Sequence, residues 1–320
     1  MELNPNVPPS AGRGRRIATA IRRPRTQIWF LLPAVVLYGG FFILPTLASY
    51  WLAMYDWSGL GPLGDFIGFD NFRRVFEDQE FRRAALHNLW IFIALFVMTN
   101  TVSLFLAVLL DRKSWMRGPY RAIIFLPYIL SPVVTGFIFE VLLSPNIGIV
   151  NPALDAIGLG SLQHTWLADP RTALPVIIIA LAWQWNALAT VIFMAGLQNV
   201  PPEMREAAIT DGASPLGVFR HVTLPYLAPA FTVVNVLLAI FAFRAFDLVY
   251  VIGGAIGAPN GATLVMGTVI YGNAFGKGSF LDVTTRMSYA MAQGIVLFVI
   301  LGLVAALLLV YLSRRERRVH

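Results

Sequence analysis

The side chains that could do chemistry in this sequence lie in two places. The first is Gln184-Trp185-Asn186, where amide groups could hydrogen-bond to hydroxyls and an indole could stack against a sugar ring. The second is a polar stretch at 199–226, whose charged and apolar residues suit contact with another protein. Cys is absent, the four His have no metal-ligand spacing, and neither a Walker A motif nor a nucleophile–base pair is present. We therefore expect no catalytic residues and no metal site.

The elements that must position these residues are those of a membrane protein. Hydrophobic residues make up 57% of the 320 residues and charged residues 13%, about half the charged fraction of a soluble domain. A net charge of +7 would also suit nucleic acid, but the basic residues cluster at the chain ends and in one short loop beside apolar runs. This distribution predicts contact with membrane lipid and none with nucleic acid.

Six segments are long and apolar enough to cross a bilayer as helices, which takes about 20 residues. They are 28–52, 88–110, 122–143, 174–196, 229–252 and 289–312. Their continuous apolar character favours helices over a β-barrel, whose strands would alternate polar and apolar residues. We predict an all-α, multi-pass fold with a transmembrane domain over 27–313, between basic tails at 1–26 and 314–320.

The distribution of Lys and Arg predicts which side is cytoplasmic. With six spans, the two tails and the loops at 111–121 and 199–226 share one side, which carries 16 basic residues against 7 on the other. The remaining one, Arg244, lies within a span. The N- and C-termini are therefore both expected in the cytoplasm.

The stretch at 199–226 interrupts the apolar pattern and predicts two short helices. A Pro-Pro pair suits the first turn of one helix, which would run to about Asp211 and stop at Gly212. Ser214 would cap a second helix, ending before Leu224-Pro225. The second helix would expose Leu216, Val218 and Phe219 beside charges, a surface that suits a groove in another protein. The alternative is a structured loop without a partner.

Three elements in order, Glu206-Ala207-Ala208, Asp211-Gly212-Ala213 and Leu224-Pro225, resemble the EAA loop of ABC importer permeases. Val222 stands where that family usually has Ile. In the family, the helices of the loop lie in a cleft of the nucleotide-binding subunit and transmit ATP-driven closure to the membrane helices. The resemblance implies a coupling site made of Arg205, Glu206, Ala207, Ala208, Asp211, Gly212, Leu216 and Phe219.

Further stretches extend the resemblance over nearly the whole chain and towards the carbohydrate-type permeases, related to the maltose and glycerol-3-phosphate importer subunits. They include Phe125-Leu-Pro127, Trp166-Leu-Ala-Asp-Pro170, Ala195-Gly-Leu-Gln198 and Phe246-Asp-Leu-Val-Tyr250. The resemblance implies the type I ABC importer permease fold, a place in the bacterial cell membrane, and half of the pathway for a di- or oligosaccharide or a glycerophosphate-type solute.

The same resemblance implies the partners of the chain. They are a second, non-identical permease subunit, two ATP-binding cassette subunits that bind ATP and Mg, and an extracytoplasmic solute-binding protein. No cofactor is expected in this chain itself.

Polar residues inside spans are costly and usually functional. Alignment with the maltose importer family on Trp183 and Phe241-Ala-Phe243 implies a solute pathway that includes Leu181, Gln184, Trp185, Leu188, Ile240 and Arg244. Several of these differ in chemistry from the maltose pattern, which weighs against maltose itself. Ser131 and Thr135, near two prolines that can kink the third span, are candidate pore-lining hydroxyls.

Several of these residues have a structural alternative. The Gln184-Trp185-Asn186 group could hydrogen-bond between helices, Arg244 could pair with Asp247, and the two hydroxyls could serve helix packing. Among whole functions, a non-sugar solute for the same fold stays open. A membrane-embedded transferase would need catalytic acids or His in the membrane, where the sequence has only Asp247 and the peripheral Glu140. A secondary transporter would need inverted repeats, which the two halves do not show.

Overall fold

The computed structural model describes residues 24–111, 117–277 and 285–316. Contacts divide the chain into two compact units, Met1–Leu52 and Ala53–His320. In the first unit, α2 (Pro24–Tyr38) continues through a π-helical turn at Gly39–Ile43 into α3 (Leu44–Leu52). The 24 residues Trp29–Leu52 are long and apolar enough to cross a membrane, and none of them is buried. Such an apolar surface requires lipid or another chain around it.

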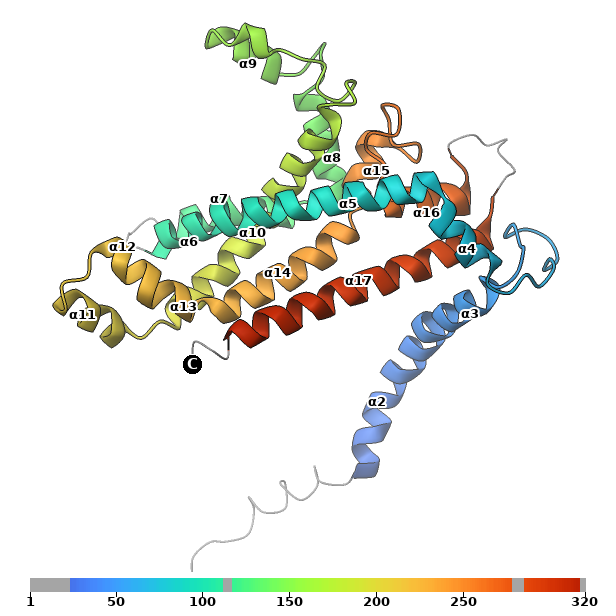
Figure 1. Ribbon diagram of the computed structural model, residues 1–320, viewed down its shortest axis with the longest axis horizontal. Helices are drawn as coiled ribbons and strands as arrows, with labels where there is room; N and C mark the ends of the chain where they lie inside the picture. The colour runs from blue at the N-terminus through green and yellow to red at the C-terminus, as the bar shows by residue number, and fades with distance from the viewer. Residues whose placement is uncertain (1–23, 112–116, 278–284, 317–320) are drawn as a thin grey trace, which may run out of the picture. The chain divides into compact units, whose positions relative to one another are not determined.

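Within the described residues of the second unit, four continuous segments are long and apolar enough to cross a membrane: Gln79–Asp111, Ala173–Gln198, Ala228–Gly253 and Met287–Arg314. The first comprises α5 (Gln79–Met98), a π-helical turn at Thr99–Ser103 and α6 (Leu104–Asp111), and the second is α10 (Ala173–Gln198). The third comprises α14 (Ala228–Phe243) and α15 (Asp247–Gly253), and the fourth is most of α17 (Met287–Glu316). Helix α14 packs beside both α5 and α17 (Figure 1).

The segment predicted as one helix over 122–143 is broken. It forms α7 (Arg117–Ile129) and α8 (Pro132–Leu142), which are bent by 97° relative to each other. Ser131 has extended backbone angles, φ −59° and ψ 141°, because the ring of the following Pro132 disfavours a helical conformation there. The described residues thus contain six crossing segments when the bent pair counts as one, and five when it does not.

Shorter elements connect the long helices. Helix α4 (Asp70–Glu77) precedes α5, α9 (Val150–Ala156) and a 3-10 turn at Gly160–Leu162 follow α8, and α16 (Met266–Phe275) packs against α17. The 199–226 stretch contains α11 (Pro202–Thr210), α12 (Pro215–Val218), a π-helical turn at Phe219–Thr223 and α13 (Leu224–Tyr226). Figure 1 shows α11 and α12 at one end of the second unit and α4 and α16 at the opposite end.

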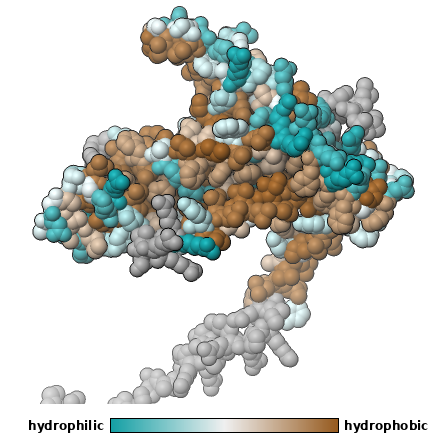
Figure 2. Space-filling view, viewed as in Figure 1, coloured by the Kyte–Doolittle hydropathy of each residue, from teal (hydrophilic) through white to brown (hydrophobic). Residues whose placement is uncertain are grey.

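Hydrophobic residues lie along the middle of the second unit and hydrophilic residues gather at its two ends (Figure 2). Inside, residues such as Leu95, Phe193 and Leu238 are fully buried between the long helices. On the outside, Leu303 and Leu307 of α17 have exposed fractions of 60% and 70%. This pattern fits a unit whose middle lies in lipid and whose ends lie in water.

Buried polar side chains join the long helices. Thr99 Oγ1 donates to Asn186 Oδ1 at 2.9 Å, and Ser103 Oγ donates to the Asn186 carbonyl at 3.2 Å. Asn100 and Asn235 exchange amide hydrogen bonds of 2.7 and 3.1 Å. These bonds tie the Gln79–Asp111 segment to α10 and α14, as polar residues do between helices in a membrane. Asn186 therefore belongs to the framework of helix contacts.

The loop after α9 is held by its own side chains. The backbone N–H of Arg171 donates to the Asp169 carboxylate at 2.8 Å, and His164 Nε2 lies 2.6 Å from the same carboxylate. These two bonds, the backbone one first, hold the pKa of Asp169 below its ordinary value because they stabilise its charged form. Asn151 bonds to the His164 carbonyl and to Trp166 Nε1, which closes the loop.

Candidate coupling loop and membrane cavity

The first helix of the 199–226 loop begins at prolines and ends at a glycine. Pro202 opens α11, where a missing N–H costs no helical hydrogen bond. At the other end, the N–H of Gly212 donates to the Ile209 carbonyl at 3.0 Å, and the N–H of Ala213 donates to the Ala208 carbonyl at 2.9 Å. This pair of bonds is a Schellman motif, and Gly212 supplies the left-handed backbone that it requires, with φ 84°. The helix stop that the sequence predicts at Gly212 is therefore present.

The second helix begins as predicted but ends later. Ser214 Oγ accepts a hydrogen bond from the N–H of Gly217 at 3.2 Å, which caps α12. The prediction that this helix ends before Leu224-Pro225 is wrong, because the π-helical turn at Phe219–Thr223 continues it into α13. Leu224 is itself helical, with φ −64° and ψ −41°. The wide π-helical turn directly before Pro225 makes room for a ring that would clash with a regular preceding turn.

The exposed surface of the loop mixes charge with apolar side chains. Glu206, Ala207 and Asp211 are exposed, Ala208 is half-buried, and Gly212 lies at the exposed turn. Three large apolar residues of the loop are also exposed, Met204, Ile209 and Leu216, with exposed fractions of 45%, 62% and 74%. Three large apolar side chains on a short polar loop are costly in water, so this surface suits a protein partner.

A cavity of about 420 Å³ lies between the loop and residues of α6 and α10. Val218 and Phe219 line it, together with Leu197 of α10. The prediction that both are exposed is wrong for Val218, which is buried at 9% exposure, and Phe219 is half-buried. The second helix therefore turns part of its apolar side towards the membrane helices and leaves Leu216 exposed.

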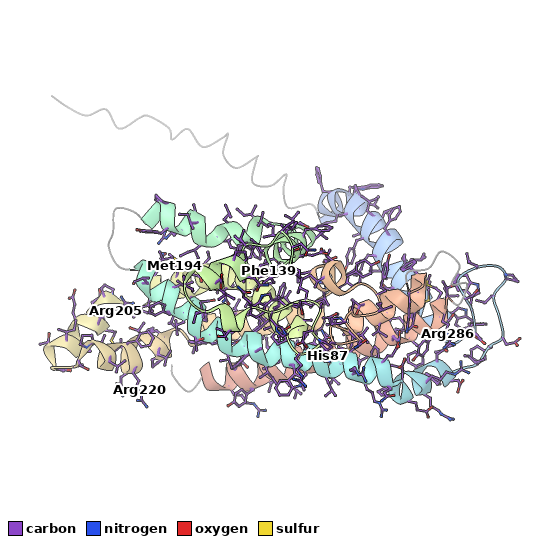
Figure 3. The ribbon with its side chains drawn as sticks, turned by 90° about the horizontal axis from the view of Figure 1, so that it is seen from above. His87, Phe139, Met194, Arg205, Arg220 and Arg286 are labelled. Atoms are coloured by element: carbon purple, nitrogen blue, oxygen red, sulfur yellow. The ribbon has the colours of Figure 1, made fainter. Side chains whose placement is uncertain are left out.

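Arg205 links the loop to two of the spans. One guanidinium nitrogen lies 3.6 Å from the carboxylate of Asp111, the last residue of α6, and another donates to the Leu197 carbonyl in α10 at 3.4 Å. Figure 3 shows Arg205 at the loop end of the second unit and Arg286 at the opposite end. Arg205 thus has contacts within its own chain, and its contact with an ATPase stays a prediction.

A second cavity, of about 430 Å³, lies among the membrane-spanning helices. All six residues that alignment places on the solute pathway line it: Leu181, Gln184, Trp185, Leu188, Ile240 and Arg244. The indole of Trp185 stacks on Phe241, with ring centroids 4.7 Å apart and planes inclined by 25°. The cavity therefore combines a flat aromatic wall with polar groups, which is the chemistry that binds sugar rings.

The two hydroxyls predicted for the pathway lie outside this cavity. Ser131 is exposed at the break between α7 and α8, and Thr135 is fully buried within α8. Neither lines the membrane cavity. The sequence correctly indicated that both residues lie near the break, but it did not indicate the direction in which their side chains would point.

The two polar atoms of the Gln184 amide, Nε2 and Oε1, have different surroundings. Its Nε2 donates at 2.7 Å to the carbonyl of Leu130, which the break between α7 and α8 leaves without a helical partner. Its Oε1, like Nε1 of Trp185, is buried and forms no hydrogen bond with the described residues. Buried polar atoms are costly when unpaired, so the free acceptor and the free donor both suit a polar ligand in the cavity.

Two charged side chains line the membrane cavity where α14 ends and α15 begins. Arg244 follows the last residue of α14, Asp247 is the first residue of α15, and both are exposed and line the cavity. The ion pairs among the described residues include neither side chain. The Arg244–Asp247 pair considered from the sequence is thus absent from this structure, and both charges face the cavity.

The spans, the cavity among them and the capped loop at one end define a helical membrane transport subunit. Residues 99–318 match the binding-protein-dependent transport system inner membrane components, and the chain belongs to that family. It is the permease subunit of an ABC importer, a multi-pass membrane protein with a transport role. Among the described residues, no group of three or more His, Cys, Asp or Glu side chains could hold a metal ion.

Relatives of known assignment support this membership. The multiple sugar-binding transport system permease protein MsmF of Streptococcus mutans is 30% identical, over 90% of this chain and 96% of its own length. The lactose transport system permease protein LacF of Rhizobium radiobacter is 33% identical, over 90% and 94%. A chain of a bacterial ABC transporter involved in import of the acidic polysaccharide alginate has the same fold, with a TM-score of 0.75 at 23% identity over 95% of this chain and 99% of its own.

Proposed function

We propose that this permease carries a sugar or sugar-like solute and that its 199–226 loop docks on a separate ATPase subunit. The observation that carries the docking proposal is the turn closed at Gly212, which sets α11 and α12 against each other at one end of the second unit. The turn leaves Leu216 exposed together with the charges of Glu206 and Asp211. Glu206 can accept charge-assisted hydrogen bonds from the ATPase, while Leu216 enters an apolar groove of it.

The remaining partners follow from this role. Two ATPase subunits bind ATP and Mg and hydrolyse the nucleotide, one on this chain and one on a second, non-identical permease. A solute-binding protein delivers the solute from the opposite side, and this chain holds no cofactor of its own. The excess of basic residues on the side of the loop supports cytoplasmic N- and C-termini.

Two observations support a sugar or sugar-like solute. The names of MsmF and LacF assign sugars to those relatives, and the membrane cavity offers an aromatic wall beside a free acceptor and a free donor. Gln184 Oε1 can accept a hydrogen bond from one hydroxyl, and Trp185 Nε1 can donate one to another. The unpaired Arg244 and Asp247 can each bind hydroxyls, or Arg244 can bind a phosphate of a glycerophosphate-type solute.

Docking is tested by purifying the full complex from cells that also express both ATPase subunits and the second permease. Leu216→Asp places a charge in the proposed apolar contact, and we expect it to release the ATPase while the two permeases stay together. The control is Ile157→Asp after α9, where the side chain is similarly exposed at 70%. Retention of the ATPase by Leu216→Asp at the level of the control would remove the loop from the docking surface.

The solute class is tested by uptake into vesicles that contain the complex and its binding protein, with di- and oligosaccharides, glycerophosphates and amino acids as competitors. Trp185→Phe keeps an aromatic ring at this position but removes the N–H together with the five-membered ring of the indole. We expect the inhibition constant of a competing sugar to rise about threefold to tenfold, the value of one hydrogen bond, with ATPase binding unchanged. Competition by amino acids alone would contradict the sugar assignment.

A further inference from the structure

A third cavity, of about 460 Å³, lies beside the loop, between α5, α14 and α17. It is bounded by Phe96 of α5, Leu224 of α13, Phe231 of α14 and Leu312 near the end of α17. These four side chains give it an apolar wall along three of the long helices. We call this cavity the α5–α14–α17 groove.

The polar residues deep in the groove are already satisfied. Asn100 and Asn235 line it, and their amides bond to each other, while each also donates to a carbonyl of its own helix. They therefore leave few hydrogen-bonding positions free for a bound molecule. An apolar chain can lie against this pair and the surrounding rings without leaving a polar group unpaired.

The mouth of the groove carries positive charge. Arg220 is the one charged side chain among the described residues that line it, and no acidic residue lines it beside Arg220. Arg220 is exposed and takes part in none of the ion pairs between described residues. Figure 3 shows it at the same end of the second unit as Arg205, on the side of the 199–226 loop. The groove thus combines an apolar interior with a free cation at its mouth.

We propose that the α5–α14–α17 groove binds an anionic phospholipid of the inner leaflet, with an acyl chain along Phe96 and Phe231 and the phosphate on Arg220. The proposal rests on the cytoplasmic placement of the loop under the proposed function, since that leaflet carries the anionic lipids. Charge complementarity selects this occupant: basic pockets between spans on the cytoplasmic side hold anionic head groups. A wholly apolar protein segment would leave Arg220 at the edge of an apolar contact without an acid.

The site has a consequence for coupling. Arg220 belongs to the π-helical turn at Phe219–Thr223, which continues α12 of the docking loop into α13 and so to α14. A phosphate on Arg220 therefore holds the second loop helix against the membrane surface. We expect ATP-driven uptake to be faster in vesicles that contain anionic lipid than in neutral ones.

The test uses the complete transporter with its ATPase subunits, reconstituted in phosphatidylcholine alone or with phosphatidylglycerol. Native mass spectrometry after detergent extraction counts retained phosphatidylglycerol, and uptake is measured in parallel. Arg220→Gln should weaken phosphatidylglycerol retention about fivefold and abolish its stimulation of uptake. Ala228→Trp, which fills the groove without touching the charge, should also release the lipid. The control, Arg314→Gln, removes an exposed arginine near the end of α17 that does not line the groove.

Three outcomes overturn the proposal: equal phosphatidylglycerol retention in wild type and Arg220→Gln, equal retention of phosphatidylcholine and phosphatidylglycerol by wild type, or loss of the second permease with Ala228→Trp while phosphatidylglycerol stays bound. The last outcome would make the groove a subunit contact. The proposed docking function fails separately, when wild type does not retain its ATPase in either lipid.

Discussion

Replacing Gly212 tests whether the shape of the docking turn, and not its side chains, sets the affinity for the ATPase. A Cβ at this position would meet no atom of the described residues within 4 Å, so none of them clashes with a side chain. The cost is that of the backbone alone, at φ 84°, and for Ala it is about 1–2 kcal/mol. That energy lowers the equilibrium ratio of the docking geometry to other turn geometries by a factor of about 5 to 30.

We therefore expect Gly212→Ala to weaken ATPase binding to the assembled permease pair by about 5- to 30-fold. Gly212→Asn should weaken it less, because Asn adopts the left-handed conformation more readily, and Gly212→Val should weaken it more, because a β-branched residue resists it. The assay is titration of the permease pair in nanodiscs with labelled ATPase subunit.

The matched control is Gly302→Ala in α17, where an added Cβ also meets nothing within 4 Å but the backbone is helical. It should leave the affinity for the ATPase unchanged. The reasoning is refuted by Gly212→Ala and Gly212→Val that bind the ATPase as tightly as wild type while assembling normally with the second permease.

Two further predictions concern other parts of the chain. Gln184→Leu should leave the Leu130 carbonyl, at the break between α7 and α8, unpaired and destabilise the subunit by about 1–3 kcal/mol. This effect would be seen as a lower thermal unfolding temperature in detergent. An unchanged temperature would show that another group satisfies this carbonyl. The lowered pKa of Asp169 means that its bonds to Arg171 and His164 stabilise the loop after α9. This contribution is complete above the ordinary carboxyl pKa of about 3.9 and is lost as pH falls through the lower folded value. Hydrogen exchange of the loop should accelerate over that acidic range in wild type, whereas Asp169→Asn should show no such transition.

The features that could be predicted from the sequence are those governed by local rules. Apolar runs of sufficient length indicated the helices, and glycine and serine at the right spacing indicated the stop at Gly212 and the cap at Ser214. The late end of the second loop helix could not be predicted, because a Leu-Pro pair normally stops a helix and nothing local indicates the π-helical turn that accommodates Pro225. The break before Pro132 was expected as a kink, but its size depends on packing against distant helices.

Predictions for the candidate site likewise succeeded where local sequence decides and failed where distant packing decides. Six of the residues that line the membrane cavity could be named from one alignment, whereas others, such as Tyr128 and Leu237, were not. The partner of Gln184 Nε2 could not be named, since Leu130 becomes available only after the third span breaks. The inward side of Val218 was missed for a related reason: a four-residue helix is too short for periodicity to show which face is buried.

The bonds of Arg205 limit how far the docking loop can be treated as a transferable module. A chimera that receives residues 199–226 from this chain would inherit Arg205 but not Asp111, which lies 3.6 Å from it in this structure and comes from a distant part of the sequence. The transplanted loop could still recognise its ATPase while losing its attachment to α6. Exchange of the loop between permeases should therefore transfer recognition without transport, unless the end of α6 is exchanged with it.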